Sequence, residues 1–284
     1  MSREIAADLH MHTTASDGTS TLEERIEQAK EKSLGTIAVT DHDTINPDLA
    51  GRSHEVDGLE IISGVEIKTE INGDNIEILC YFIDPENSEL QELLEEVRSN
   101  RRERNKKIAE NINQKTVADI DLDELREDAD GFVSRPHFAK KLIEQGVVED
   151  MSEAFGKHLS TKGDCYTSME RVPAEKVISI AHSAGAICSL AHPGRAKTDD
   201  IEEIISELKN TGLDALEVYY PYQENPPERY AGTTEKEAGK LAEKFDLLKT
   251  GGSDCHGPGS GKFRIGEKGV TSGELQEIRE KAGL

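Results

Sequence analysis

Residues 5–12 read Ile5-Ala-Ala-Asp-Leu-His-Met-His12, a short apolar run that ends in two histidines. After it, Thr21-Leu-Glu-Glu24 has the residues of a capping box at the start of an amphipathic helix. Residues 36–40, Thr36-Ile-Ala-Val-Thr40, are again rich in residues that favour strands. A strand, a helix and a strand in this order predict a β-α-β unit.

Strand-like runs separated by helical patterns continue along most of the chain. They fall at residues 59–65, 76–83, 186–191, 214–219 and 247–250. Because strands that alternate with helices form mainly parallel sheets, we expect an α/β fold whose sheet is open or closed into a barrel.

The alternation stops between about Pro85 and Tyr166. This stretch opens with a long charged helical pattern and continues with shorter ones around Leu122, Pro136 and Met151. We therefore predict a helical insertion at residues 85–166, within an α/β domain built from residues 1–84 and 167–284.

The chain of 284 residues is strongly acidic, with 57 acidic against 34 basic residues and a formal charge of −23. This charge opposes stable binding to long nucleic acid or to anionic membranes, so a polyanionic ligand must be bound locally. The sequence shows neither a signal-peptide pattern nor a run of 18 apolar residues, which predicts a cytoplasmic protein without a membrane span. Its four cysteines form no C-x-x-C pair, which argues against a zinc knuckle and a disulfide framework.

Histidines and acidic residues gather at the ends of the expected strands. In parallel α/β folds the carboxyl ends of the strands share one edge, so we expect these side chains to meet there. Imidazole together with carboxylate suits zinc, manganese or iron, and one carboxylate such as Glu66 can bridge two ions. We predict a centre of two or three divalent ions, with Mn²⁺ favoured over Zn²⁺, Fe²⁺ or Mg²⁺. The strand-end ligands are His10, His12, His42, Glu66, His192, Asp254 and His256.

A single histidine is more often a structural residue than a metal ligand. We predict structural roles for His54, His158 and His182. Asp17, in the turn Ser16-Asp-Gly18, could cap the next helix. Because Ser20 and Thr21 already supply that cap, we favour Asp17 as a further ligand.

Several cations held in this way can clamp a phosphoryl group and lower the pKa of a bound water, so that metal-bound hydroxide is the expected nucleophile. No Ser-His-Asp, G-x-S-x-G, Walker A or dinucleotide-binding pattern competes with this interpretation. The residues predict a metal-dependent phosphoric ester hydrolase.

Six motifs together resemble the PHP (polymerase and histidinol phosphatase) metal-dependent phosphoesterases. The resemblance spans essentially the whole chain and implies a distorted seven-stranded (β/α) barrel with a helical insertion. The insertion resembles the branch that acts on nucleotides, which includes 3′,5′-nucleoside bisphosphate phosphatases and 5′-to-3′ exonucleases for short RNA. The motifs are His10-Met-His-Thr-Thr-Ala-Ser-Asp-Gly18, Thr40-Asp-His-Asp-Thr44, Gly64-Val-Glu66, Arg135-Pro-His-Phe-Ala139, Ala191-His-Pro-Gly-Arg195 and Gly252-Ser-Asp-Cys-His256.

The resemblance also implies three metal positions. One would be held by His10, His12, Glu66 and Asp254, and one by Asp17, His42 and His256. The third would use bridging Glu66 with His192 and a further residue, where the family commonly has histidine and this chain has Glu77. Glu77 could favour a harder ion such as manganese, or leave the third position weak.

On the substrate side, Arg135 and Arg195 are assigned to phosphate oxygens, with an ordinary salt bridge as the alternative for Arg195. His137 would contact the phosphate, act as general acid, or close the third metal position. Tyr219 could stack on a base or only pack its loop. In Arg101-Arg-Glu-Arg-Asn-Lys-Lys107, helical spacing places Arg101, Arg104 and Lys107 on one face, usually a solvated one and otherwise a guide for a polyanion.

The favoured function is hydrolysis of a nucleotide phosphomonoester, namely the 3′-phosphate of a 3′,5′-nucleoside bisphosphate. Its first rival is a 5′-to-3′ phosphodiesterase that trims short oligonucleotides. A histidinol-phosphatase-like enzyme and a metal-binding PHP module without catalysis are weaker alternatives. The expected partner is a small phosphate ester or a short oligonucleotide, and no protein partner is indicated.

Overall fold

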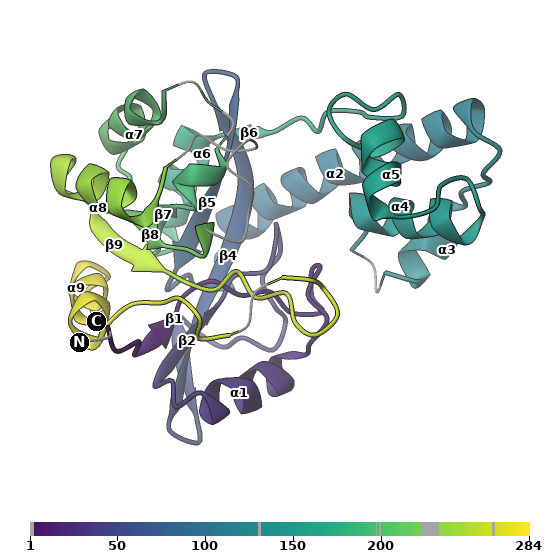
Figure 1. Ribbon diagram of the computed structural model, residues 1–284. Coiled ribbons are helices and arrows are strands. Elements are labelled where there is room, and N and C mark those ends of the chain that lie inside the picture. The colour runs from purple at the N-terminus through teal and green to yellow at the C-terminus, as the bar shows by residue number, and fades with distance from the viewer. Residues whose placement is uncertain (1–2, 130–131, 197, 199, 223–232, 263–264) are drawn as a thin grey trace. The chain divides into compact units, whose positions relative to one another are not determined.

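The computed structural model describes residues 3–129, 132–196, 198, 200–222, 233–262 and 265–284 (Figure 1). The chain forms two compact units. Met1–Glu95 and Val172–Leu284 make up the first, here called the barrel unit, and Glu96–Arg171 make up the second, the helical unit.

A nearly closed sheet dominates the barrel unit. Within the described residues, a path of seven strands runs in the order β1-β2-β4-β5-β7-β8-β9. The amide of Leu9 donates to the carbonyl of Gly251 at 3.1 Å, and Met11 bridges to Cys255, so that the two ends of the path approach each other. The predicted seven-stranded α/β barrel is thereby confirmed. Its strands are β1 (Ala7–Asp8), β2 (Thr36–Val39), β4 (Leu59–Ile71), β5 (Asp74–Tyr81), β7 (Ile187–Leu190), β8 (Ala215–Tyr219) and β9 (Leu248–Gly251).

One strand of this path, β5, runs against its neighbours. The pairs β1-β2, β2-β4, β7-β8 and β8-β9 are parallel as expected, whereas β5 is antiparallel to both β4 and β7. The cause is a tight turn at Asn72-Gly73, with φ of 52° and 86°, which pairs Ile71 directly with Asp74. Positive φ at both central positions is what a two-residue hairpin requires, and Asn-Gly supplies it. Asp57-Gly58 does the same between β3 (Ser53–Val56) and β4.

Amphipathic helices flank the sheet (Figure 1). The first, α1 (Leu22–Glu31), begins with the capping box that the sequence indicates, in which Thr21 and Glu24 bond each other's backbone. Thr234 and Thr271 cap two further helices in the same way. The remaining elements of this unit are β6 (Val172–Pro173), α6 (Ala174–Ser183), the short 3₁₀ turn η2 (Pro193–Arg195), α7 (Ile201–Asn210), α8 (Glu235–Lys244) and α9 (Ser272–Lys281).

The helical unit has a core of its own. The long helix α2 (Ser88–Lys115) starts in the barrel unit, where Ser183 donates to Glu89 at 3.0 Å, and the division between the units falls inside it. The sequence predicts that the helical insertion begins at Pro85, three residues before the start of this helix. Ile112, Phe138 and Leu142 are among the fully buried residues of the second core. The other elements are α3 (Leu122–Glu127), α4 (Arg135–Glu144), α5 (Met151–Ala154) and the π-helical turn η1 (Phe155–Leu159).

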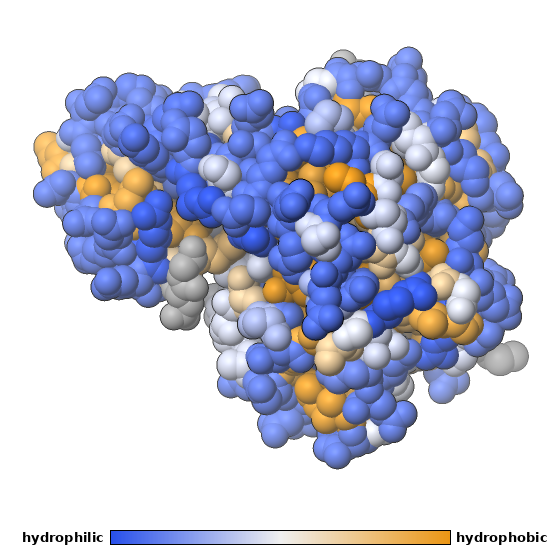
Figure 2. All heavy atoms as spheres, turned by 180° about the vertical axis from the view of Figure 1, so that it is seen from behind, coloured by the Kyte–Doolittle hydropathy of each residue, from blue (hydrophilic) through white to orange (hydrophobic). Residues whose placement is uncertain are grey.

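Hydrophilic side chains cover most of the face shown in Figure 2, as the composition leads us to expect. Every helix in the described ranges is either too short or too polar to serve as a membrane span. The four cysteines are free thiols and all are buried.

Candidate metal centre

Four side chains at the open edge of the barrel point at a common centre. The Nε2 atoms of His10 and His12 lie 3.3 Å apart, and they lie 3.4 and 3.5 Å from Glu66 Oε2. Asp254 Oδ1 lies 3.6 Å from His10 Nε2 and 3.1 Å from His12 Nε2. Ligands about 2.1 Å from an ion in a tetrahedron are roughly 3.4 Å apart, so these spacings match a tetrahedral site.

The backbone conformation at this edge places the ligand side chains, and several residues there have positive φ angles. His10 and His12 follow β1 and share one face because side chains alternate along an extended chain. Asp254 and His192 have φ of 51° and 25°, in the left-handed region that non-glycine residues rarely adopt. Asp43, next to His42, has φ of 54°. Such strain concentrates at functional sites, where the surrounding structure holds it in place.

A second group of ligand atoms adjoins the first. Asp17 Oδ1 lies 3.1 Å from His256 Nε2, and Asp17 Oδ2 lies 3.8 Å from His42 Nε2. With His12 these residues offer atoms that all lie within 4.8 Å of one another. His42 also reaches Glu66 Oε2 with its Nδ1 atom, at 2.8 Å, so Glu66 connects the two groups.

The remaining oxygen of Glu66 faces a third group. Glu66 Oε1 lies 3.0 Å from His192 Nε2, which in turn lies 3.3 Å from Glu77 Oε2. Atoms of His42, Glu66 and Glu77 also lie within 4.8 Å of one another. The structure thus brings together all nine residues that the sequence analysis proposed as ligands. We call this set the metal cluster, and it comprises His10, His12, Asp17, His42, Glu66, Glu77, His192, Asp254 and His256.

The electrostatics of the metal cluster favour bound cations. Burial alone would raise the pKa of the Glu66 and Asp254 carboxyls, but the charged and imidazole groups around them hold both pKa values well below the usual range. Burial lowers the pKa of His12, and His256 and His42 act in the same direction. Its imidazole is therefore neutral, which is the form that binds metals. At His10, the neighbouring Glu217 and Glu66 outweigh burial and raise the pKa, so the cluster attracts positive charge.

Three buried carboxylates support the ligands or the loops that carry them, a role not predicted from the sequence. Glu217 accepts from His10 Nδ1 at 2.9 Å and from the amide of His192 at 2.7 Å. Asp41 accepts from Thr13 and Ser16, in the loop that leads to Asp17. A carboxylate behind a metal-binding histidine fixes the ring's orientation and raises its basicity.

Asp8 is the third of these carboxylates. It accepts from the amide of His10 at 3.3 Å, and from the amide and hydroxyl of Ser253 at 3.0 and 2.6 Å. The strand alternation Asp8, His10, His12 is the sequence signal that could have revealed it. With converging ligand atoms, ionised carboxylates and this support, the described residues fit divalent cations at the centre.

On the proposed substrate side, Arg195 lies beside the metal cluster. Its Nη1 atom is 3.1 Å from Asp254 Oδ2 and 2.5 Å from the hydroxyl of Tyr220, which donates to the same carboxylate oxygen. The bulge between Glu217 and Tyr219 in β8 changes the alternation at this point. Tyr219 instead donates to Glu274 at 2.6 Å, with the Arg3 guanidinium stacked on its ring. Of these two tyrosines, Tyr220 therefore contacts the metal cluster, and Tyr219 does not.

Arg135 and His137 lie in the helical unit, in the first turn of α4. His137 Nδ1 accepts from the amide of Ser134 at 2.9 Å and so closes the N-terminal cap. Arg135 donates to the carbonyl of Leu159 at 3.3 Å. The three histidines predicted to be structural lie outside the metal cluster. Of these, His158 pairs with Asp164 at 2.7 Å and His182 with Asp214 at 2.8 Å.

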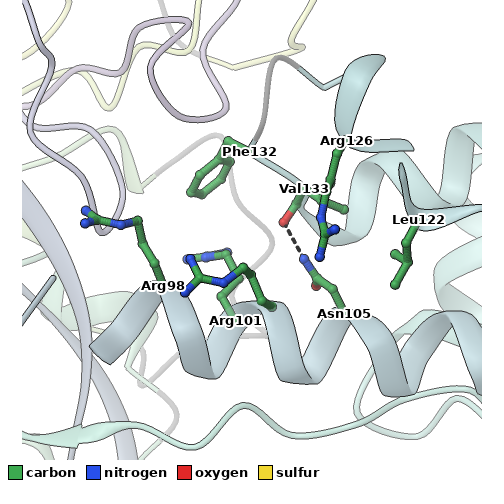
Figure 3. A pocket seen from close by; sticks show the side chains of 8 residues that line it. Arg98, Arg101, Asn105, Leu122, Arg126, Phe132 and Val133 are labelled. Atoms are coloured by element: carbon green, nitrogen blue, oxygen red, sulfur yellow. Dashed lines mark hydrogen bonds between the residues drawn. The ribbon is translucent and has the colours of Figure 1, made fainter. Parts of the chain in front are cut away.

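The basic run in α2 lines a pocket inside the helical unit (Figure 3). Arg101 and Arg104 are only 5% and 9% exposed, so they do not belong to a solvated helix face. The Arg101 guanidinium lies 4.5 Å from the centre of the Phe132 ring. Lys107, in contrast, is exposed and pairs with Glu103 at 3.4 Å. We call this site the arginine pocket, and its lining residues are Arg98, Arg101, Arg102, Asn105, Leu122, Arg126, Phe132 and Val133.

The fold and the metal cluster are typical of metal-dependent phosphoesterases, and comparison with known families gives the same class of protein. The chain belongs to the PHP domain family, whose model matches residues 8–217. It is therefore a phosphoesterase, a hydrolase of phosphoric esters.

The chain is also similar to individual proteins of known activity or structure. The chain is 33% identical to the 5′-3′ exoribonuclease Rnm of Salmonella typhimurium, over 89% of this chain and 86% of that protein. It is 28% identical to a 3′,5′-nucleoside bisphosphate phosphatase of Chromobacterium violaceum, over 91% and 90% of the two chains. A crystal structure described as a metal-dependent phosphoesterase of Bifidobacterium adolescentis superposes with a TM-score of 0.77 and 29% identity, over 96% and 94% of the two chains.

Proposed function

We propose that this protein hydrolyses a nucleotide phosphomonoester, with the 3′-phosphate of a 3′,5′-nucleoside bisphosphate as the favoured substrate. The observation that carries the proposal is the convergence of His10, His12, Glu66 and Asp254, whose ligand atoms lie 3.1–3.6 Å apart. Divalent ions held there would neutralise phosphate oxygens and lower the pKa of a bound water. Mn²⁺ is the favoured ion, because carboxylates supply four of the nine proposed ligands.

The protein's own residues would bind and orient the ester. Arg195 and Tyr220 adjoin Asp254, where an N–H and an O–H can reach phosphate oxygens. His42 and His256 flank Asp17. In the helical unit, we assign Arg135 and His137 to a substrate phosphate, with His137 as the candidate general acid.

The arginine pocket gives the helical unit a cationic site of its own. Its arginines stand out in a chain of net charge −23, and guanidinium groups bind phosphate oxygens well. This supports a phosphate-bearing ligand for the helical unit.

A second candidate function is 5′-to-3′ cleavage of short oligonucleotides. It is favoured because the exoribonuclease relative is 33% identical, against 28% for the bisphosphate phosphatase. The two functions differ in the bond that breaks. A phosphatase releases inorganic phosphate, whereas the exonuclease releases mononucleotides and needs room for the rest of the chain.

The test measures phosphate and mononucleotide release from 3′,5′-bisphosphoadenosine, a 5′-phosphorylated RNA trinucleotide and histidinol phosphate, with Mn²⁺-loaded protein. The comparison variant is His10→Ala with Asp254→Ala, and the matched control is His158→Ala with Asp164→Ala, a His-Asp pair outside the metal cluster. We expect turnover of the bisphosphate, reduced to the level of metal-free protein in the first variant and kept in the control. Preferred turnover of the trinucleotide would establish the second candidate. Turnover of histidinol phosphate alone, or of none of the three, would refute both.

A further inference from the structure

Lys68 lies beside Glu77 in the third ligand group. The register of the sheet determines this position. The Asn72-Gly73 turn pairs β4 with β5 so that Lys68 lies directly opposite Glu77. Directly opposed residues of an antiparallel pair point to the same face. Lys68 is also two positions from Glu66 in the same strand, so both side chains face the metal cluster.

The Lys68 ammonium contacts two of the third group's residues. Its Nζ atom lies 3.2 Å from Glu77 Oε1 and 3.2 Å from His42 Nδ1. The Lys68 amide donates to Asp43 at 2.9 Å, which fixes the backbone at this position. The Lys68 and Glu77 side chains are 19% and 21% exposed, so solvent screens their attraction only in part.

The charges of Glu77 and Lys68 together determine whether the third group can bind a divalent ion. The carboxylate of Glu77 alone would add a negative charge and strengthen binding of a third ion. The Lys68 ammonium cancels that charge, and a divalent ion at His42 and Glu77 would meet a positive charge within contact distance. A third ion would therefore have to displace the lysine.

We propose that the Lys68 ammonium takes the place of a third metal ion, so that the centre holds two divalent ions and one lysine cation. This inference rests on the metal centre of the proposed function, but not on the identity of the ester. Lys68 then supplies a fixed positive charge next to the two ions, on the side of Glu77 and His192. Such a charge would hold a phosphate oxygen as a point cation.

The experiment counts Mn²⁺ ions per chain by inductively coupled plasma mass spectrometry after Mn²⁺ loading and dialysis. We expect two ions in the wild-type protein, three in Lys68→Ala, and two in the control Lys249→Ala, whose lysine pairs with Glu243 away from the metal cluster. Three ions in the wild type, or two in Lys68→Ala, would overturn the proposal. Circular dichroism establishes that both variants are folded.

A second measurement needs no variant. In crystals of the Mn²⁺-loaded wild type, anomalous scattering at the manganese edge should give two peaks, with Lys68 Nζ still beside Glu77. A third peak between His42, Glu77 and His192 would contradict the proposal. A protein that binds no Mn²⁺ in either measurement would refute the metal centre itself. Failure of the substrate test with two ions bound would refute only the proposed ester.

Discussion

The metal cluster and the arginine pocket fix their charged side chains in different ways. The ligands of the metal cluster come from strand ends far apart in the chain, and buried carboxylates such as Glu217 hold them from behind. Three of the pocket's arginines, Arg98, Arg101 and Arg102, come from consecutive turns of α2, and Arg126 comes from α3. The metal cluster therefore depends on the whole barrel, whereas most of the pocket's cations depend on a single helix.

The largest effect is expected at the support of the metal cluster. Glu217→Gln removes the charge that orients His10, so we expect metal affinity to fall about 10–100-fold. Isothermal titration calorimetry with Mn²⁺ measures this change. The control is Glu243→Gln, an exposed carboxylate paired with Lys249. Unchanged affinity in Glu217→Gln would mean that the barrel fixes the ligands without this carboxylate.

The arginine pocket should respond in phosphate binding alone. Arg101→Ala removes a cation from the pocket, so we expect the Kd of metal-free protein for a nucleoside bisphosphate to rise about 10-fold, which corresponds to one charge-assisted hydrogen bond. Isothermal titration calorimetry measures the Kd, and the Mn²⁺ content after metal loading should stay the same. Lys107→Ala, on the exposed face of the same helix, is the matched control. If both variants keep the wild-type Kd, the pocket has only a structural role.

The smallest effect is expected at a His-Asp pair outside the metal cluster. Burial would raise the pKa of Asp214, but its hydrogen bonds with His182 and the Cys188 amide hold the pKa below its ordinary value of 3.8. Because the folded state favours the ionised form, this stabilisation is complete above pH 3.8 and is lost as the pH falls through the folded pKa.

We expect Asp214→Asn to cost about 1–2 kcal/mol at neutral pH, with a smaller difference from wild type well below pH 3.8. Urea unfolding at both pH values measures the difference, and Mn²⁺ content should not change. A loss of bound Mn²⁺ would show that this pair is part of a metal site after all.

The sequence predicted which residues converge in the metal cluster better than it predicted the directions of the strands that carry them. The strand alternation and the turn residues were enough to select His10, His12 and Asp254. The antiparallel direction of β5 was missed, although Asn72-Gly73 is a strong hairpin signal. The supporting role of Glu217 could not be found from one sequence, because its partners His10 and His192 are remote in the chain and depend on the barrel's closure.

The closure of the barrel has a consequence for the order of folding. Asp8, near the N-terminus, binds Ser253 and Gly266, so these contacts span 245 residues or more. During synthesis, His10 and His12 emerge first and must wait for almost the whole chain before Asp254 reaches them. Closing so long a loop is slow. A nascent chain that ends before β9 would hold the first two proposed ligands without Asp254, so we expect tight metal binding only late in folding.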